Sequence, residues 1–450
     1  MSSASLPPGD ESAALPLQDR PTPPDRPTPP AALYLHLPFC IARCPYCDFV
    51  VYAGGDARGP RARTDRLYAA LDRELGLRAD ALDRRFGTAR PALASVYFGG
   101  GTPSLVSGEW LERLMATIRE RYGIAAGAEV TLESNPGADE RGDMARFVGA
   151  GVTRLSLGAQ SLDAGELRRL GRRHSPGDVT AALAEAREAG IASINLDLLY
   201  DVPGQSVAAW RATLEAALRL APDHLSLYSL TLDDPDEEGL TGRQGDHLPT
   251  LSGARRWRER ARADQDDERA ADQYELATAL LADGGWHGYE ISNWARPRHE
   301  SRHNLAYWER RSYEAVGPGA HAFDGVVRRW NAANLEAYVA ALSGDAPVAG
   351  GSDDTPDDTP DAAGPRIPPG GEETLTPDGA AAERVILALR LDRGVPELWA
   401  RVPPLADSRN WAVEAGLLES FRGVEAESEP RLRLTTRGRL LSNELFSRLV

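Results

Sequence analysis

All three cysteines of the chain, Cys40, Cys44 and Cys47, lie within a run of eight residues in the spacing C-x3-C-x2-C. Thiolates this close together are typical of a metal centre rather than a disulfide framework, and the odd number of cysteines agrees with that interpretation. Three thiolates are one fewer than the four that close ordinary iron–sulfur or zinc sites. The fourth coordination position is therefore left for a histidine such as His36 or for a ligand from outside the protein. Because open positions are where metal chemistry takes place, we expect the function of the chain at this stretch.

A run of glycines is the second candidate, Gly99-Gly100-Gly101, followed by Thr102 and Pro103. It differs from the dinucleotide-binding fingerprint, because the glycines are consecutive and the proline interrupts entry into a helix. A tight turn needs only one glycine, whereas three allow the backbone to approach a ligand closely. The run is therefore either a turn or a loop that contacts a ligand.

Polar side chains at or just beyond the ends of predicted strands form the third candidate, and they are Glu133, Asn135, Gln160, Arg172 and Asp197. Each alone is more typical of a cap or a turn than of a site. Together they offer carboxylates for ribose hydroxyls or an ammonium group, an amide, and a guanidinium that can pair a carboxylate bidentately. The set predicts a site for a zwitterion and a ribose.

The hydrophobic pattern predicts alternating strands and helices that would position these residues. Strands are predicted at 33–37, 94–98, 129–133, 154–158, 193–199 and 224–230. Helices are predicted at 64–82, where Thr64 is the expected cap, and at 108–122, 139–150, 177–189 and 206–220. Such alternation indicates βαβ units and a parallel sheet, either a barrel or a doubly wound fold. Both folds place their chemistry at the C-terminal ends of the strands.

The length of 450 residues predicts two or three domains. The predicted divisions are a disordered Pro-rich tail at 1–30, a core at 31–232, a connecting region at 233–343, a low-complexity linker at 344–373 and a C-terminal module at 374–450. Within the connecting region, residues 233–272 are acidic and arginine-rich and are expected to be solvated. In the last module, helices near 377–390 and 407–417 precede a strand at 431–434 and a final helix, an order that suits a winged-helix-like fold.

Composition excludes several classes of function. The net charge of −16 argues against non-specific binding to nucleic acid or anionic lipid, since both are polyanions. No apolar run approaches the twenty residues of a membrane span, and the first thirty residues lack the features of a signal peptide. Reduced cysteines without an export signal point to the cytoplasm.

The cysteine spacing after a strand that reads Tyr-x-His-x-Pro-Phe-Cys resembles the radical S-adenosylmethionine (SAM) enzymes. The resemblance implies a partial, open TIM-like (β/α)6 barrel with a [4Fe–4S] cluster, in which three thiolates hold three irons and SAM binds the fourth. It therefore explains why three cysteines suffice. The SAM contacts that it implies are Tyr34, Tyr46, Gly101, Thr102, Glu133, Gln160, Arg172 and Asp197.

Further motifs resemble the HemN-like group of that superfamily over nearly all of residues 33–450, outside the acidic insert and the linker. They include residues 155–161, 170–174, 198–205, 225–230, 289–293 and 303–308. Within the group the chain looks like the HemW-like haem chaperones, because Phe49 stands where coproporphyrinogen dehydrogenases have a further cysteine. Asp201 stands where the family usually has glycine, and aspartate is a tolerable substitute if that position needs a positive φ.

The chaperone branch implies haem as cargo, haem-requiring proteins such as respiratory enzymes as partners, and an electron donor for the cluster. Its HNxxYW motif, residues 303–308, suggests His303 as a ligand of the haem iron with Tyr307 and Trp308 packed on the porphyrin, and His321 is a rival ligand. Two alternatives stay open, an oxygen-independent coproporphyrinogen III oxidase and a zinc-stabilised interaction protein. Whether SAM is turned over and whether the protein dimerises are left open.

Overall fold

The computed structural model describes residues 26–59, 62–242, 244–344, 366–422 and 429–450. The chain divides into two compact units, one of which spans Pro24–Leu375 and the other of which contains Thr376–Val450. Most of the predicted N-terminal tail and most of the predicted linker lie outside the described residues.

Six neighbouring parallel strands form the centre of the larger unit, as the sequence predicts. In sheet order they are β1 (Ala32–Leu37), β4 (Leu93–Gly100), β5 (Ile124–Ser134), β6 (Arg154–Gln160), β7 (Ser193–Tyr200) and β8 (His224–Ser229). Most of their residues are buried, because side chains fill the barrel on one face and helices cover the other. Each predicted strand is therefore confirmed, although β5 begins five residues earlier than predicted.

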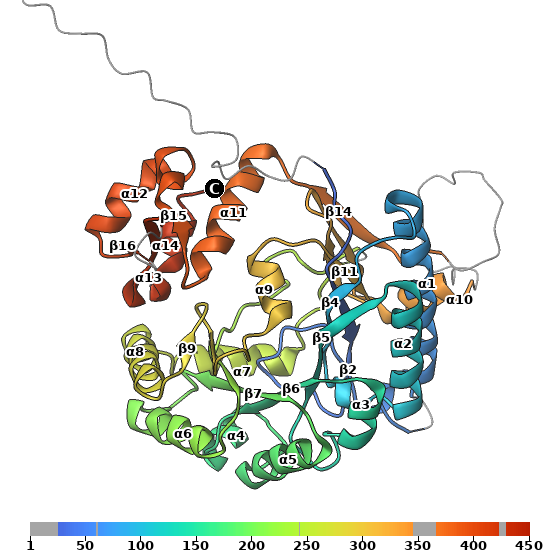
Figure 1. The fold of residues 1–450 in the computed structure, drawn as a ribbon. Coiled ribbons are helices and arrows are strands. Elements are labelled where there is room, and N and C mark those ends of the chain that lie inside the picture. The colour runs from blue at the N-terminus through green and yellow to red at the C-terminus, as the bar shows by residue number, and fades with distance from the viewer. Residues whose placement is uncertain (1–25, 60–61, 243, 345–365, 423–428) are drawn as a thin grey trace, which may run out of the picture. The chain divides into compact units, whose positions relative to one another are not determined.

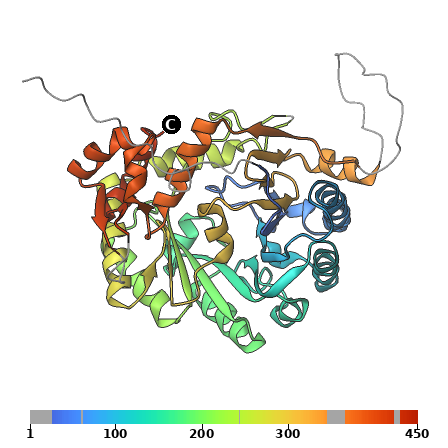
Figure 2. The same ribbon diagram turned by 45° about the horizontal axis from the view of Figure 1, so that its top comes forward.

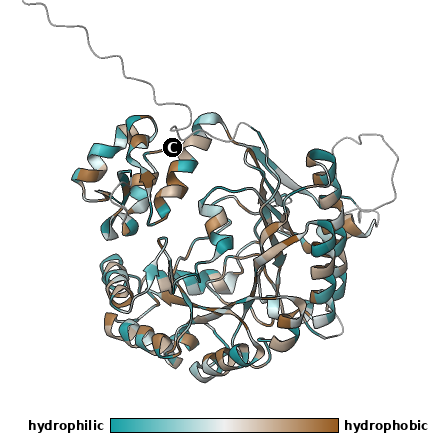
Figure 3. Cartoon of the chain, viewed as in Figure 1, coloured by the Kyte–Doolittle hydropathy of each residue, from teal (hydrophilic) through white to brown (hydrophobic). Residues whose placement is uncertain are grey.

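Helices follow these strands and form a ring outside them (Figures 1 and 2). They are α1 (Thr64–Phe86), α2 (Gly108–Arg121), α3 (Met144–Ala150), α4 (Ala164–Arg169), α5 (Pro176–Ala189) and α6 (Val207–Arg219). Figure 3 shows that they carry hydrophobic and hydrophilic residues in alternation along their length. Their apolar stripes bury against the sheet.

One predicted cap and one predicted helix start were wrong. The prediction made Thr64 a cap, whereas α1 begins with Thr64 as its first residue and continues to Phe86. The helix predicted from residue 139 begins at Met144, because the side chain of Asp143 accepts a hydrogen bond from the amide of Arg146 and so caps it there.

The sheet continues beyond the six strands on both sides. Next to β1 lie β11 (Tyr313–Val316), which is parallel to it, and then the antiparallel strands β12 (His321–Phe323), β13 (Val327–Asn331) and β14 (Gly370–Thr374). Next to β8 lie the antiparallel strands β10 (Asn293–Ala295) and β9 (His287–Gly288). Within the described part of the chain the order ends at β14 and β9, so the barrel is open.

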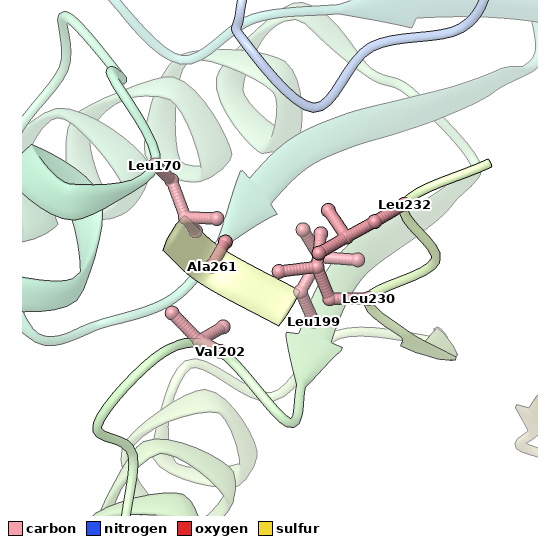
Figure 4. Close-up of a cluster of buried hydrophobic side chains, with 6 residues drawn as sticks. All are labelled: Leu170, Leu199, Val202, Leu230, Leu232 and Ala261. Atoms are coloured by element: carbon pink, nitrogen blue, oxygen red, sulfur yellow. The ribbon is translucent and has the colours of Figure 1, made fainter. Parts of the chain in front are cut away.

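The prediction that residues 233–272 are solvated holds for most of them but was wrong for one face of the helix that they contain. Helix α7 (Ser252–Arg262) buries Arg258 and Ala261, and helix α8 (Asp267–Asp283) follows it. Figure 4 shows Ala261 in an apolar cluster with five residues of the barrel, Leu170, Leu199, Val202, Leu230 and Leu232. The many arginines of α7 made its whole sequence look solvent exposed, and most of its residues are, but the face that carries Arg258 and Ala261 is buried.

Three further elements complete this unit. A two-stranded ribbon of β2 (Phe39–Cys40) and β3 (Tyr52–Ala53) encloses the cysteine loop. Helix α9 (Arg302–Trp308) packs against β4, and helix α10 (Leu335–Ser343) packs against α1. Helix α9 contains the whole HNxxYW motif.

The C-terminal unit contains a three-stranded sheet with helices. Its elements are α11 (Pro377–Arg390), β15 (Val395–Pro396), α12 (Leu405–Glu414), β16 (Leu418–Phe421), β17 (Arg431–Leu434), α13 (Thr436–Leu440) and α14 (Ser442–Phe446). The winged-helix interpretation of this unit stays a prediction. None of the helices in the described ranges of the chain has the length and apolar character needed to cross a membrane.

Candidate metal and cofactor site

The cysteine loop connects β2 to β3. Cys40, the last residue of β2, is buried, whereas Cys44 and Cys47 are partly exposed. The backbone amide of Cys47 donates to the carbonyl of Cys44 at 3.2 Å, which closes a turn around Pro45. The three thiols are free, so all three are available as ligands.

Burial raises the pKa of the Cys40 thiol to about 11 and that of the Cys47 thiol to about 12, and repulsion from a Cys44 thiolate adds to both shifts. In the metal-free protein these two thiols are therefore protonated at neutral pH. A metal that binds here must release their protons, as thiolate ligands generally require.

The donor set suits a cluster better than a single ion. Among the described residues, no three His, Cys, Asp or Glu side chains converge on one point where they could hold a metal ion. A [4Fe–4S] cluster does not require such convergence, because each thiolate binds a different iron. His36, the alternative fourth ligand of a zinc site, uses both ring nitrogens elsewhere: Nδ1 lies 3.0 Å from the hydroxyl of Tyr34, and Nε2 lies 2.8 Å from the carbonyl of Val50.

The glycine run packs against the strand that leads to the cysteines. A Cβ atom on Gly99 would lie 2.8 Å from the ring of Tyr34, and one on Gly101 would lie 2.7 Å from the carbonyl oxygen of Phe39. Gly100 has φ +118°, and a Cβ there would lie 2.7 Å from the ring of His36. The three glycines thus let the end of β4 approach the cysteine loop.

A chain of hydrogen bonds links two of the cysteines through predicted site residues. The hydroxyl of Thr102 donates to the sulfur of Cys40 at 3.4 Å and accepts from the side-chain amide of Asn135 at 3.0 Å. The guanidinium of Arg172 donates to the side-chain oxygen of Asn135 and, at 3.4 Å, to the sulfur of Cys44. The thiols therefore have polar donors beside them, which suits sulfur atoms that carry negative charge in a cluster.

Gly158 marks the point where the remaining polar residues of this group meet. A Cβ atom there would lie 3.0 Å from the Nε2 of Gln160, 3.2 Å from the Oδ1 of Asn135 and 3.4 Å from Arg172. Gln160 has φ +63°, and the pairing of β6 with β7 shifts in register just before it. Local irregularities of this kind re-aim a side chain, and here the irregular residue is a predicted SAM contact.

The two predicted carboxylates lie inside the barrel. Glu133 accepts from the hydroxyl of Tyr97 at 2.8 Å and from the amide of Gly100 at 2.9 Å. Asp197 accepts from the hydroxyl of Ser156 at 3.0 Å and from the side-chain amide of Asn195 at 2.8 Å. Burial raises the pKa of both, that of Glu133 to about 7, and repulsion from Asp197 adds to its shift. Ligand hydroxyl or ammonium groups would stabilise their charged forms.

Several of these side chains are surrounded by protein and yet remain partly accessible to solvent. Tyr34, Tyr97, Glu133, Asp197 and Arg172 share this property. It is typical of groups that line a concave site. Tyr46, on the cysteine loop, shares it as well.

His303 adjoins this group on the side of the N-terminal ends of the strands, and its ring lies 5.0 Å from that of Tyr97 and 6.4 Å from that of Tyr34. Its Nδ1 is 3.0 Å from the hydroxyl of Ser95 and its Nε2 is 2.8 Å from that of Tyr307, so both ring nitrogens are occupied. The side chain is buried, and burial lowers its pKa to about 3. Its backbone amide donates to Glu129 on β5, which fixes the start of α9 inside the barrel.

His321 is more accessible, with 38% of its side chain exposed. Its Nε2 lies 2.7 Å from a carboxylate oxygen of Asp246, and its ring stacks on Trp330 at 5.9 Å. The other oxygen of Asp246 lies 3.0 Å from the Nδ1 of His247. The structure thus brings a second accessible histidine to this place.

Sequence reasoning missed three residues of this region, Tyr97, Arg258 and His247. Tyr97 had a usable signal, because it lies on a strand paired with the strand of Glu133, opposite Thr131 and so on the same face of the sheet as Glu133. Arg258 and His247 belong to the segment that was expected to be solvated, and nothing in its composition distinguishes them.

The Radical SAM superfamily matches residues 34–217. The heme chaperone HemW of Mycobacterium tuberculosis is 38% identical over 421 residues, which are 94% of this chain and 95% of that protein. The heme chaperone HemW of Escherichia coli is 36% identical over 295 residues, which are 65% of this chain and 70% of that protein. The solved structure of coproporphyrinogen III oxidase (HemN) from Escherichia coli matches 96% of this chain and 91% of that chain with a TM-score of 0.69 and 22% identity, a likeness of fold alone.

Proposed function

Because the chain belongs to the HemW family of radical SAM proteins, we propose that it binds haem and transfers it to haem-requiring proteins. The observation that supports this most is the 38% identity to a heme chaperone over nearly the whole length of both chains. Respiratory enzymes are the class of recipient that we propose. The cytoplasmic location and the electron donor stay predictions.

Cys40, Cys44 and Cys47 are proposed to hold a [4Fe–4S] cluster, and the remaining site residues are proposed to hold SAM. When reduced, the bound cluster supplies one electron for cleavage of SAM. Arg172 would bind the carboxylate of SAM, because it is a guanidinium directly beside Cys44. Gly101 and Thr102 would face its amino group. Glu133 and Asp197 would accept hydrogen bonds from its ribose hydroxyls or amino group, while Tyr34, Tyr46 and Gln160 would enclose it.

The haem iron needs an axial ligand, and His303 and His321 are the proposed candidates. A neutral imidazole is the form that binds iron. The low pKa of His303 keeps it neutral, but it would have to leave Tyr307 and become accessible. His321 is already accessible, and its contact with Asp246 resembles the carboxylate contacts that orient metal-binding histidines.

An anaerobic haem titration followed by Soret absorbance tests the proposal. Wild type, His303→Ala and His321→Ala are compared after cluster reconstitution. His299→Ala is the control, because the ring of His299 forms a hydrogen bond with Ser193 and belongs to neither proposed haem-binding region. Saturable binding that one variant loses would support the chaperone function and assign the ligand. Absence of binding by wild type would contradict it.

The alternative is an oxygen-independent coproporphyrinogen III oxidase, which the fold of HemN keeps under consideration. In place of the further cysteine of that branch the chain has Phe49, a side chain that is 61% exposed. Incubation of the reconstituted protein with coproporphyrinogen III and SAM under reducing conditions, followed by chromatography, tests it. Formation of protoporphyrinogen would favour the oxidase over the chaperone.

A further inference from the structure

Arg258 of helix α7 holds the cysteine loop by its backbone. Its Nε donates to the carbonyl of Pro45 at 3.3 Å, and its Nη2 donates to the carbonyls of Tyr46 and Cys47 at 3.3 and 3.1 Å. Its Nη1 donates to the carbonyl of Asp233. The side chain is buried, with only 3% of the residue exposed. One guanidinium therefore satisfies three consecutive carbonyls of the loop that carries the ligands.

The same helix also contacts the segment that carries Arg172. The indole of Trp257 donates to the carbonyl of Arg169 at 3.1 Å, and its ring lies 6.3 Å from that of Tyr46. Tyr46 and Trp257 pack against the apolar cluster that contains Ala261 (Figure 4). Helix α7 thus joins the cysteine loop to the connection between α4 and α5.

The direction of these carbonyls determines the direction of the amides. In a trans peptide the N–H points opposite to the C=O, so the carbonyls that face Arg258 turn the amides of Tyr46, Cys47 and Asp48 away from it. The next amide along, that of Phe49, hydrogen-bonds the sulfur of Cys47 and works to lower its pKa. Hydrogen bonds to ligand sulfurs and local charge both set the reduction potential of an iron–sulfur cluster.

We propose that Arg258 is a positioning residue that orients the peptide groups of residues 45–48 and thereby sets the reduction potential of the cluster. This rests on the proposal that Cys40, Cys44 and Cys47 hold a [4Fe–4S] cluster. Reduction adds negative charge to the cluster, so a buried guanidinium and well-directed amides both favour the reduced state.

The test compares Arg258→Gln with Arg260→Gln in the full-length protein. Arg260 is on the same helix but exposed, so its replacement removes the same charge without touching the loop. In an anaerobic redox titration followed by electron paramagnetic resonance, Arg258→Gln is expected to show a more negative potential than wild type, and Arg260→Gln the wild-type potential. Equal potentials in the two variants would overturn the proposal.

Arg258→Lys separates charge from orientation, because lysine keeps the charge but cannot reach three carbonyls with one planar fork. We expect the reduction potential of the lysine variant to lie between those of Arg258→Gln and wild type. A potential equal to that of wild type would show that charge alone sets it and would contradict the positioning role. Lysine also keeps a buried cation, which provides a testable variant if glutamine prevents folding.

Hydrogen exchange of the cluster-free protein is the second measurement. Loss of several charge-assisted hydrogen bonds is expected to speed exchange of the amides of residues 46–49 by about tenfold or more in Arg258→Gln but not in Arg260→Gln. Unchanged exchange would contradict the claim that Arg258 holds the backbone of the cysteine loop in place. Because this readout needs no cluster, a wild type that fails to assemble one would refute the proposed function and leave the inference on the loop testable.

Discussion

The guanidinium of Arg172 donates to the sulfur of Cys44 at 3.4 Å, although the two residues are far apart in the sequence. Its other terminal nitrogen donates to the carbonyl of Gly158 at 2.9 Å and to Asn135. The N–H on Nε is buried and has no hydrogen-bond partner among the described residues. Because an unpaired buried donor is unfavourable, the geometry leaves Arg172 ready to accept an anionic group beside the cysteine loop.

Replacement of Arg172 by leucine is therefore expected to weaken SAM binding by about 10- to 100-fold, which corresponds to the loss of one or two charge-assisted hydrogen bonds. Equilibrium binding of SAM to the reconstituted protein measures the effect. Arg173→Leu is the control, because Arg173 is exposed and pairs with Asp139. An affinity of Arg172→Leu for SAM equal to that of the control would show that Arg172 does not contribute to SAM binding.

Replacement of Cys44 by alanine is expected to abolish cluster assembly and to leave the barrel folded, since its partly exposed side chain contributes little to the core. Iron and acid-labile sulfide analysis after anaerobic reconstitution measures assembly, and circular dichroism measures folding. Normal cluster content in the variant would refute the ligand assignment.

Replacement of Gly100 by alanine is expected to lower stability by about 2–4 kcal/mol, because the new Cβ adds a steric clash to an unfavourable φ of +118°. His36 cannot move aside easily, since it is buried and both of its ring nitrogens are bonded. Gly127→Ala is the matched control. There φ is +70° and the space is open, so about 1 kcal/mol is expected. Denaturant unfolding of the cluster-free protein compares them, and equal losses would contradict the clash.

The stabilising effect of His303 is expected to depend on pH. Its pKa is about 3 in the folded protein and about 6.5 in the unfolded chain. Below pH 6.5 the unfolded chain gains a proton that the folded protein does not, so the stability due to His303 falls by about 1.4 kcal/mol for each pH unit.

Measurement of melting temperatures at pH 7 and pH 5 for wild type and His303→Gln tests this. The variant is expected to be less stable than wild type by about 2 kcal/mol at pH 7, because it loses buried hydrogen bonds. This difference in stability is expected to narrow at pH 5, because wild type loses the contribution of His303. The other buried histidines are common to both proteins and cancel in the comparison. A gap that stays constant would show that His303 does not titrate on unfolding in this range.

The sequence predicted the six strands and the presence of most helices, because each is amphipathic or buried over its own length and needs no distant information. It also placed Glu133 and Asp197 at strand ends, and parallel strands bring such residues to one place. The conditional expectation for Asp201 is met as well: its φ is +54°, and its carboxylate pairs with Arg269 on α8.

What the sequence did not predict depends on contacts between distant segments. Arg258 looks like its neighbours in an arginine-rich stretch, and only the packing of Ala261 on the barrel turns it inward. The histidine of the HNxxYW motif was expected to face a ligand, whereas its hydrogen bonds to Ser95 and Tyr307 hold α9 in the barrel. The periodicity of a helical segment carries no information about which strand that helix will pack against. The haem ligand therefore stays a prediction.

The pairing of β1 with β11 has a consequence for synthesis of the protein. Ala32 to Leu35 lie between β4 and residues 313–316, so one side of the first strand has no partner until more than two thirds of the chain has been made. At an elongation rate of about 5–20 residues per second this interval is roughly 15–60 s. During that time a strand whose Leu33 and Leu35 are fully buried in the finished protein presents an unsatisfied edge. The nascent chain is thus exposed to wrong pairing for most of its translation, and the final closure of the sheet is a late event in folding.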